Sequence, residues 1–218
     1  MQFFDTHAHI GLIYEDPIEQ LRVIQQAKQA GVTRIVSINN SLHDFKKVYP
    51  NIKSMPGVYH AIGVAPVEVT NPGKNWIQTI EEGLKLPNVI AVGECGLDYY
   101  KQFGDKRMQT ELFITQLEIA KKCLEAGLNV YFSFAGNLTY RNAHNLHETV
   151  LNIPHDRILI ETESPFMVPA EFRERKRAMP AYLPSTARFL SEMLEIDLEE
   201  LSKILWTNSC KIFRLPEA

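Results

Sequence analysis

Residues 2–10 of the chain read QFFDTHAHI, and this stretch decides which folds the rest of the chain can adopt. Its first part, residues 2–5, is rich in apolar and aromatic side chains, as a buried strand would be, and it leads directly into His7-Ala8-His9. On an extended backbone, residues i and i+2 point to the same face. We therefore expect His7 and His9 to project together at the C-terminal end of a first strand, where they can share a metal ion.

Outward from this stretch, short apolar runs alternate with amphipathic helical segments. The further strands are expected at residues 34–38, 58–64, 89–92, 129–134 and 157–160. The helices are expected at residues 17–30, 42–49, 76–86, 105–125, 141–151, 185–194, 198–206 and 209–213. Asp16 is a good N-cap for the first of these helices, and Gly31 fits the position after its last turn. Strands that alternate with helices predict a parallel sheet with helical crossovers, hence an α/β fold.

The positions of the acidic residues favour a closed sheet. Glu94 follows the fourth expected strand, and Glu161 and Glu163 follow the sixth. Barrels of the (β/α) type build their sites at the C-terminal ends of several strands, whereas an open doubly wound sheet concentrates ligands at one switch point. Groups from the first, middle and last strands converge easily only when the sheet closes. We therefore expect a TIM-barrel-like fold in a single domain over residues 1–218, with an open sheet as the alternative.

These carboxylates suit metal-assisted hydrolysis. Glu94 follows an apolar strand, and a buried charge is costly unless a cation or strong donors compensate it, so metal binding or a salt bridge is expected there. Glu161 and Glu163 share one face of a strand, so that one can hold metal and activate water while the other orients it. The alternative for this pair is a set of surface acids before the turn at Pro165.

Other polar residues carry weaker signals. Asp5 could orient a histidine, and Asp98 could support the site or pair with a basic side chain. His60 lies inside a strand and is expected to be either a core group with its hydrogen bonds satisfied or a group that supports the metal ligands. The basic run at 173–177, RERKR, is expected to be a solvated charge run or a grip for phosphates.

Composition narrows the class of protein. The chain has 218 residues, of which 45% are hydrophobic and 22% charged, as in an ordinary globular protein. A net charge of −3 does not suggest long non-specific tracking along duplex DNA, but it permits a nucleic acid held by metal ions and a few basic residues. The three cysteines form no paired motif, and neither a signal peptide nor a membrane-spanning segment is evident. A cytoplasmic protein with no membrane partner is expected.

Five segments resemble motifs of the TatD family of metal-dependent deoxyribonucleases, within the amidohydrolase-like barrels. They are FFDTHAHI (3–10), AVGECGLDYY (91–100), QTELFITQLEIAKK (109–122), IPHDRILIETESP (153–165) and WTNSCKIF (206–213). The resemblance implies a TIM barrel with one or two divalent ions (Mg, Mn or Zn) that cleaves phosphodiester bonds in DNA, often from the 3′ ends of single strands. It implies metal binding by His7, His9 and Glu94, and it places Glu163 where the family has an aspartate.

The sequence departs from the family pattern in three places. Ala65 stands where the family usually has a histidine, and Glu163 is one methylene longer than the family aspartate. The third departure is larger, because two β/α units that each end in a histidine ligand are missing after the helix at 105–125. We therefore expect an incomplete barrel of about six parallel strands, possible completion of it by a second copy, and at most four of the usual ligands from this chain.

Three functional hypotheses remain. The first is a TatD-like hydrolase that cleaves DNA with metal-activated water. Its metal ligands would be His7, His9, Glu94 and Glu163, and Glu163 or Glu161 would accept the proton. The second is a catalytically impaired relative that serves as a binding or assembly module, which the missing units and Ala65 favour. The third is another hydrolysis, such as that of an amide, on the same scaffold, because a fold does not fix a function.

Overall fold

The computed structural model describes residues 1–101, 103–123 and 130–217. The chain divides into two compact units, and each is described by itself. Unit 1 consists of Met1–Val36 and Asn129–Ala218, and unit 2 consists of Ser37–Leu128. Both units contain parallel strands with helices packed on them, which confirms the α/β fold class.

In unit 1, the first and last strands of the chain lie next to each other. The strands are β1 (Phe3–Ala8), β2 (Val32–Ser37), β5 (Phe132–Phe134) and β6 (Ile158–Ile160). β1 neighbours β2, and β5 pairs in parallel with β6. Ala8 and Ser164 form a parallel bridge, and the hydroxyl of Thr6 donates to the carbonyl of Ile160 at 3.0 Å, so the end of β1 lies beside the end of β6. Contact between the first and last strands is what a barrel requires and an open sheet lacks.

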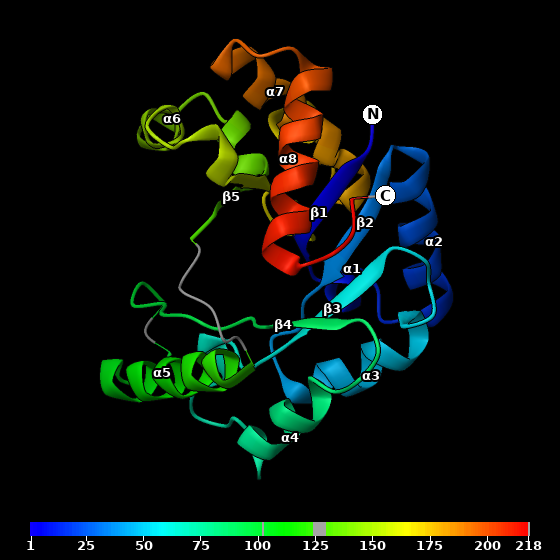
Figure 1. Cartoon of the computed structure of the whole chain (residues 1–218). Helices are drawn as coiled ribbons and strands as arrows, with labels where there is room; N and C mark the ends of the chain where they lie inside the picture. Colours follow the sequence, from blue (N-terminus) through cyan, green and yellow to red (C-terminus); the bar gives the residue numbers. More distant parts are fainter. Residues whose placement is uncertain (102, 124–129, 218) are drawn as a thin grey trace. The chain divides into compact units, whose positions relative to one another are not determined.

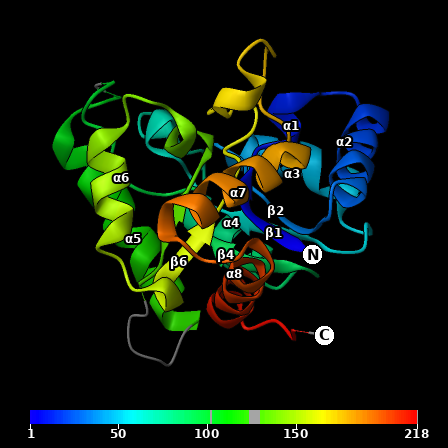
Figure 2. The same cartoon turned by 90° about the horizontal axis from the view of Figure 1, so that it is seen from above.

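The helices of unit 1 cover these strands. They are α1 (Ile10–Ile13), α2 (Pro17–Gln29), α6 (His144–Leu151), α7 (Leu183–Leu194) and α8 (Leu198–Phe213), with 3₁₀ turns at Gly136–Thr139, His155–Arg157, Ala170–Phe172 and Pro180–Tyr182. α8 packs on β1 and β6 and contacts α7, as Figures 1 and 2 show. The carboxylate of Asp197 caps α8 by accepting from the amides of Glu199 and Glu200.

Unit 2 contains two paired strands and three longer helices. Its elements are α3 (Leu42–Ile52), β3 (Val58–Ile62), a 3₁₀ turn (Pro66–Glu68), α4 (Trp76–Gly83), β4 (Val89–Val92) and α5 (Lys106–Cys123). β3 pairs in parallel with β4, α3 packs on β3, and α5 packs on β4 (Figure 1). A core of buried residues that includes Phe45, Ile62 and Ile80 joins these elements.

The structure corrects several expected boundaries. β1 continues to Ala8, so His7 lies within the strand and not after it. The two helices expected at 198–206 and 209–213 are one helix, which runs without a break from Leu198 to Phe213. The end of the helix expected at 105–125 and the start of the strand expected at 129–134 lie outside the described residues. The single domain stays a prediction.

The ring of strands is incomplete. The described residues form six strands, and within them β4 pairs only with β3, and β5 pairs only with β6. Val130 and Phe132, at the start of β5, have exposed fractions of 58% and 46%. In the described part of the chain, no helix is both long and apolar enough to span a membrane.

His60, in β3, is fully buried between aromatic rings. Its ring meets those of Tyr49 and Phe45 edge-on, with centroids at 4.8 and 6.3 Å. His60 is therefore the core group that was one of the two expectations, but within the described residues neither of its ring nitrogens has a hydrogen-bond partner. Burial disfavours the charged ring and lowers the pKa of His60 to about 4.

This histidine predicts a pH-dependent stability. The unfolded chain binds a proton at His60 below its ordinary pKa of 6.5, whereas the folded chain does not until about pH 4, so stability is lost as the pH falls through this window. We expect the free energy of unfolding to drop by about 2 kcal/mol between pH 7.5 and 5 from this group. Urea unfolding should show that His60→Leu flattens this dependence and that His43→Asn, at an exposed position, does not. An equally steep loss in His60→Leu would contradict the assignment.

Candidate metal centre

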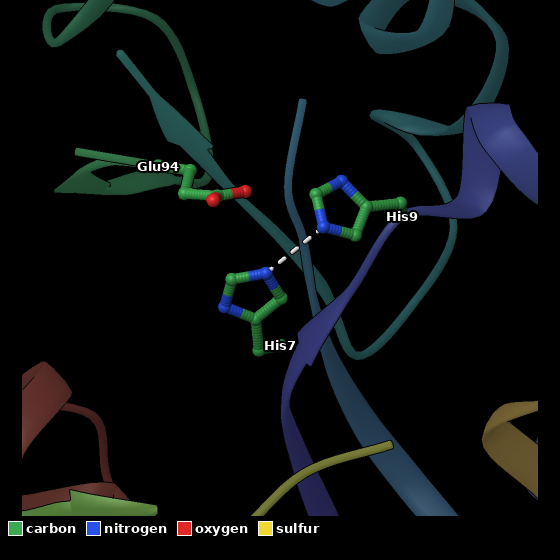
Figure 3. Close-up of side chains that lie close together, drawn as sticks. All are labelled: His7, His9 and Glu94. Atoms are coloured by element: carbon green, nitrogen blue, oxygen red, sulfur yellow. Dashed lines mark hydrogen bonds between the residues drawn. The ribbon is translucent and has the colours of Figure 1, made fainter. Parts of the chain in front are cut away.

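His7 and His9 face each other at the end of β1. Their Nε2 atoms are 3.0 Å apart, as the dashed line in Figure 3 shows. The His9 side chain is 2% exposed and that of His7 is 22% exposed, so the pair is reached through His7. The alternation of side chains along β1 places both imidazoles on one face, as the sequence predicted.

Glu163 comes to the same place from the segment after β6. Its amide donates to the carbonyl of His7 at 2.9 Å, and the amide of His9 donates to the carbonyl of Ser164 at 2.8 Å. These two backbone bonds continue the parallel ladder beyond the ends of β1 and β6. The carboxylate oxygens of Glu163 lie 3.1 Å from Nε2 of His7 and 3.8 Å from Nε2 of His9.

The backbone of Glu163 has a conformation that side chains other than glycine rarely adopt. Its φ is +54°, in the left-handed region, which costs of the order of 1 kcal/mol for a residue with a Cβ. The bond from its amide to His7 holds this conformation. Backbone strain of this kind occurs often at functional sites, and here it lies at the residue whose carboxylate meets both imidazoles.

Electrostatics keep His7 neutral and Glu163 ionised. Burial lowers the pKa of His7 to about 4, although the charge of Glu163 acts in the opposite direction. For Glu163, burial alone raises the pKa, but the hydrogen bond to His9 and the attraction to either histidine when it is protonated outweigh burial and leave the pKa below its usual value. A neutral imidazole and an ionised carboxylate are the forms that bind metal.

Glu161, two residues earlier, belongs to the same group. One ligand atom each from His7, Glu161 and Glu163 lie within 4.8 Å of one another. The amide of Glu161 bonds to the carbonyl of Phe134 on β5, which fixes the backbone of Glu161 at the end of β6. Unit 1 therefore brings together four of the five residues that the sequence nominated for the site.

The donor set fits a divalent ion. Nitrogen and oxygen ligands lie about 2.0–2.2 Å from zinc, so two ligand atoms on one ion lie roughly 3–4 Å from each other. The distances of 3.0, 3.1 and 3.8 Å among His7, His9 and Glu163 fall within this range. Imidazoles with carboxylates suit zinc and manganese, and added water ligands would suit magnesium.

Asp5 links the backbone segments that carry the metal ligands. Its buried carboxylate accepts the hydroxyl and the amide of Thr162 at 2.6 and 2.9 Å, and the amide of His7 at 3.3 Å. The Ser164 hydroxyl in turn donates to that of Thr162 at 2.6 Å. Burial raises the pKa of Asp5 to about 7, although the Thr162 bonds lower it. Asp5 therefore fixes the backbones on which His7 and Glu163 are mounted.

The sequence did not reveal the roles of Thr162 and Ser164. The side chain of Thr162, between the two glutamates, is buried and bonds to Asp5. The one available signal was the alternation of hydroxyl and acidic side chains in ETES, opposite the buried Asp5 of β1.

The remaining nominated ligand, Glu94, lies in unit 2. It follows β4 and is half-buried, and its negative charge adds to burial in raising the pKa of the neighbouring Cys95 thiol to about 11. Asp98 accepts the amides of Tyr100 and Lys101 at 3.0 and 3.1 Å and so forms a turn in the loop that follows.

Comparison with known proteins identifies the relatives of this chain. The sequence model of the family described as "TatD related DNase" matches residues 4–127 and 122–214. An uncharacterised metal-dependent hydrolase of Bacillus subtilis, YabD, is 30% identical over an alignment that spans 257 residues. The alignment includes 97% of this chain and 99% of YabD. A protein of Erwinia billingiae named as a 3′-5′ ssDNA/RNA exonuclease, TatD, is 24% identical, with 89% of this chain and 93% of that protein covered.

A solved structure shows the same fold. The crystal structure of YjjV, a TatD homologue from Escherichia coli, superposes with a TM-score of 0.84 at 21% identity and covers 98% of both chains. The alignment with YabD spans 257 residues, whereas this chain has 218, so the relative carries residues that this chain lacks. The two matches to the family model meet at residues 122–127, which is where the sequence suggested that two β/α units are missing.

The bond between Thr162 and Asp5 predicts a measurable stability loss. Thr162→Val removes the hydroxyl and leaves a buried carboxylate with one donor fewer, which costs about 1–3 kcal/mol. Thr162→Ser retains the hydroxyl and should lose much less. Urea unfolding of both variants at pH 8 measures the difference, and equal stabilities would show that the hydroxyl contributes little.

Proposed function

The chain belongs to the family of TatD-related DNases and is a metal-dependent hydrolase of that family, and we propose that it hydrolyses phosphodiester bonds in single-stranded DNA. One observation carries the proposal: two imidazole nitrogens and a carboxylate converge within 4 Å where β1 and β6 end. The three ligands leave one side of the site accessible through His7, and a hydrolytic metal site needs such an open position for water and substrate.

His7, His9 and Glu163 are the metal ligands in this proposal. A divalent ion bound to them would polarise the scissile group and lower the pKa of bound water. Glu161 or Glu163 accepts the proton, since carboxylates beside the reacting water can act as general bases, and Glu163 is held ionised. We also propose Glu94 as a ligand, on the chemistry of an acidic residue after an apolar strand and its match to the family motif.

The substrate is proposed from the chemistry of the site and from one relative. The Erwinia protein is named as an exonuclease of single-stranded DNA and RNA. A site of histidines and carboxylates with one or two ions (Mg, Mn or Zn) suits phosphodiester hydrolysis. The cytoplasmic location stays a prediction.

A catalytically impaired module is the second candidate. The residues that YabD has and this chain lacks, together with the incomplete ring of strands, favour it. In this case the metal ligands would bind an ion without turnover. Hydrolysis of an amide on the same scaffold is a third candidate, because a fold does not fix a function.

Release of nucleotides from single-stranded DNA tests the proposal. We expect activity with Mg or Mn that EDTA abolishes, and a loss of more than about 100-fold in His7→Ala/His9→Ala, because ligands contribute at least as much as the groups that orient them. His43→Ala/His155→Ala removes two exposed histidines and should retain activity. Cleavage that is equal in the two double variants, or is absent with every metal, would reject the proposed function.

We further propose that a second copy of the chain completes the ring of strands. β5 is an edge strand within the described residues. Its first residue, Phe132, and Val130 shortly before it are exposed and apolar, which favours pairing with another chain. Light scattering after gel filtration should give twice the chain mass of 25.0 kDa. A monomer at micromolar concentration, or a dimer that Phe132→Lys leaves intact, would contradict this arrangement.

A further inference from the structure

A basic loop in unit 1 has no role in the metal centre as described so far. Residues 173–177, RERKR, lie between the 3₁₀ turns Ala170–Phe172 and Pro180–Tyr182. Four of these five residues are positively charged, in a chain whose net charge is −3. A basic run that is only solvated would need no contacts to fix its position. Contacts that fix this loop beside the metal centre would instead favour a role in binding phosphates.

Two contacts attach the loop to the ends of both strands that carry the site. The Arg177 guanidinium donates to the carbonyl of Ile13 and lies over the ring of Tyr14, 4.9 Å from its centroid. Ile13 ends the short helix α1, which begins directly after His9. On the other side, the amide of Ala178 donates to the carbonyl of Pro165 at 2.8 Å, two residues after Glu163. The loop is therefore held beside the metal ligands from both β1 and β6.

The loop forms one wall of a pocket. The pocket has a volume of about 350 Å³, and Tyr14, Arg175, Lys176, Arg177 and Tyr182 line it. A second hollow of about 610 Å³, lined by residues 170–175, shares Arg175 with the first. Arg175 therefore contributes to the lining of both hollows.

The charges that face this pocket are available to a ligand. Arg175 and Lys176 are exposed, and neither forms an ion pair within the described residues. The nearby acid Glu171 pairs with Arg188 at 3.5 Å. Within residues 173–177, Glu174 is the one acidic residue. Arg177 is occupied by its bond to Ile13, so its role is to position the loop.

Aromatic rings lie beside these cations. Tyr182 stacks on Phe172 with centroids 4.1 Å apart and planes at 16°, which makes a rigid apolar platform next to the basic side chains. Cations that follow a phosphate backbone, together with aromatic rings on which bases can stack, are the combination that binds single-stranded nucleic acids. A duplex hides its base faces and could use only the cations.

We propose that this basic pocket binds the phosphate backbone of a single-stranded nucleic acid and directs the strand to the neighbouring metal centre, with Arg175 and Lys176 as the phosphate contacts. This inference rests on the proposed function, since it assigns a second contact for the same substrate. Binding and cleavage can be measured separately, so each claim can fail without the other.

The test measures the affinity for a fluorescein-labelled 12-nucleotide oligothymidylate by anisotropy, with EDTA present to prevent cleavage. Arg175→Gln/Lys176→Gln should weaken binding about tenfold and lower the slope of log affinity against log salt by about 1.4, because each phosphate contact to a single strand contributes about 0.7. Lys46→Gln/Lys47→Gln, which removes two exposed charges from α3, is the matched control and should retain the parent affinity and slope. Identical affinities in the two double variants would overturn the proposal.

Two further ligands distinguish a strand from other sources of phosphate. Thymidine monophosphate should compete weakly, because it offers one phosphate, and a 12-base-pair duplex should bind less tightly than the single strand. Equal competition by the mononucleotide, or tighter binding of the duplex, would overturn the assignment to a strand. If the parent binds the oligonucleotide as described but no metal supports cleavage, the proposed function fails and the binding site stands.

Discussion

The contact between the first and last strands is the constraint on which the rest of this structure depends. The bridge from Ala8 to Ser164 and the two backbone bonds between His7, His9 and the segment after β6 bring together residues more than 150 positions apart in the chain. Without this ladder the carboxylate of Glu163 would not lie opposite the imidazoles of His7 and His9. The incomplete ring of strands does not remove it, because β1 and β6 lie within one compact unit of the fold.

The buried carboxylate of Asp5 links the two segments, and its burial disfavours the charged form of the carboxylate. Asp5 gains three donors from the backbone and side chain of the two segments, and its raised pKa shows that burial still outweighs them. At the ends of the two strands, burial lowers the pKa of His7, while the hydrogen bond to His9 is the largest of the effects that hold the pKa of Glu163 below its usual value. The same two segments thus carry both the buried structural acid and the ligand set, so the bonds that stabilise this part of the fold also hold the ligands in position.

Much of this site could be predicted from the sequence because strand alternation is a local rule. The pair His7 and His9 and the pair Glu161 and Glu163 are each two residues apart, so their shared faces follow from the backbone alone. The left-handed backbone of Glu163, the bond from Thr162 to Asp5 and the attachment of Arg177 to Ile13 could not be predicted, because each depends on a partner more than 150 residues away or on a conformation that only packing enforces. His60 shows the opposite failure, since a general rule about buried polar groups predicted bonds that its aromatic neighbours cannot supply.

The central claim is that His7, His9 and Glu163 hold a divalent ion. The most direct measurement is anomalous diffraction from crystals grown with manganese, collected at the manganese absorption edge. The account predicts an anomalous peak at metal–ligand bonding distance from the Nε2 atoms of both histidines and from a carboxylate oxygen of Glu163. Crystals with manganese bound elsewhere, and no peak between these three side chains, would contradict it.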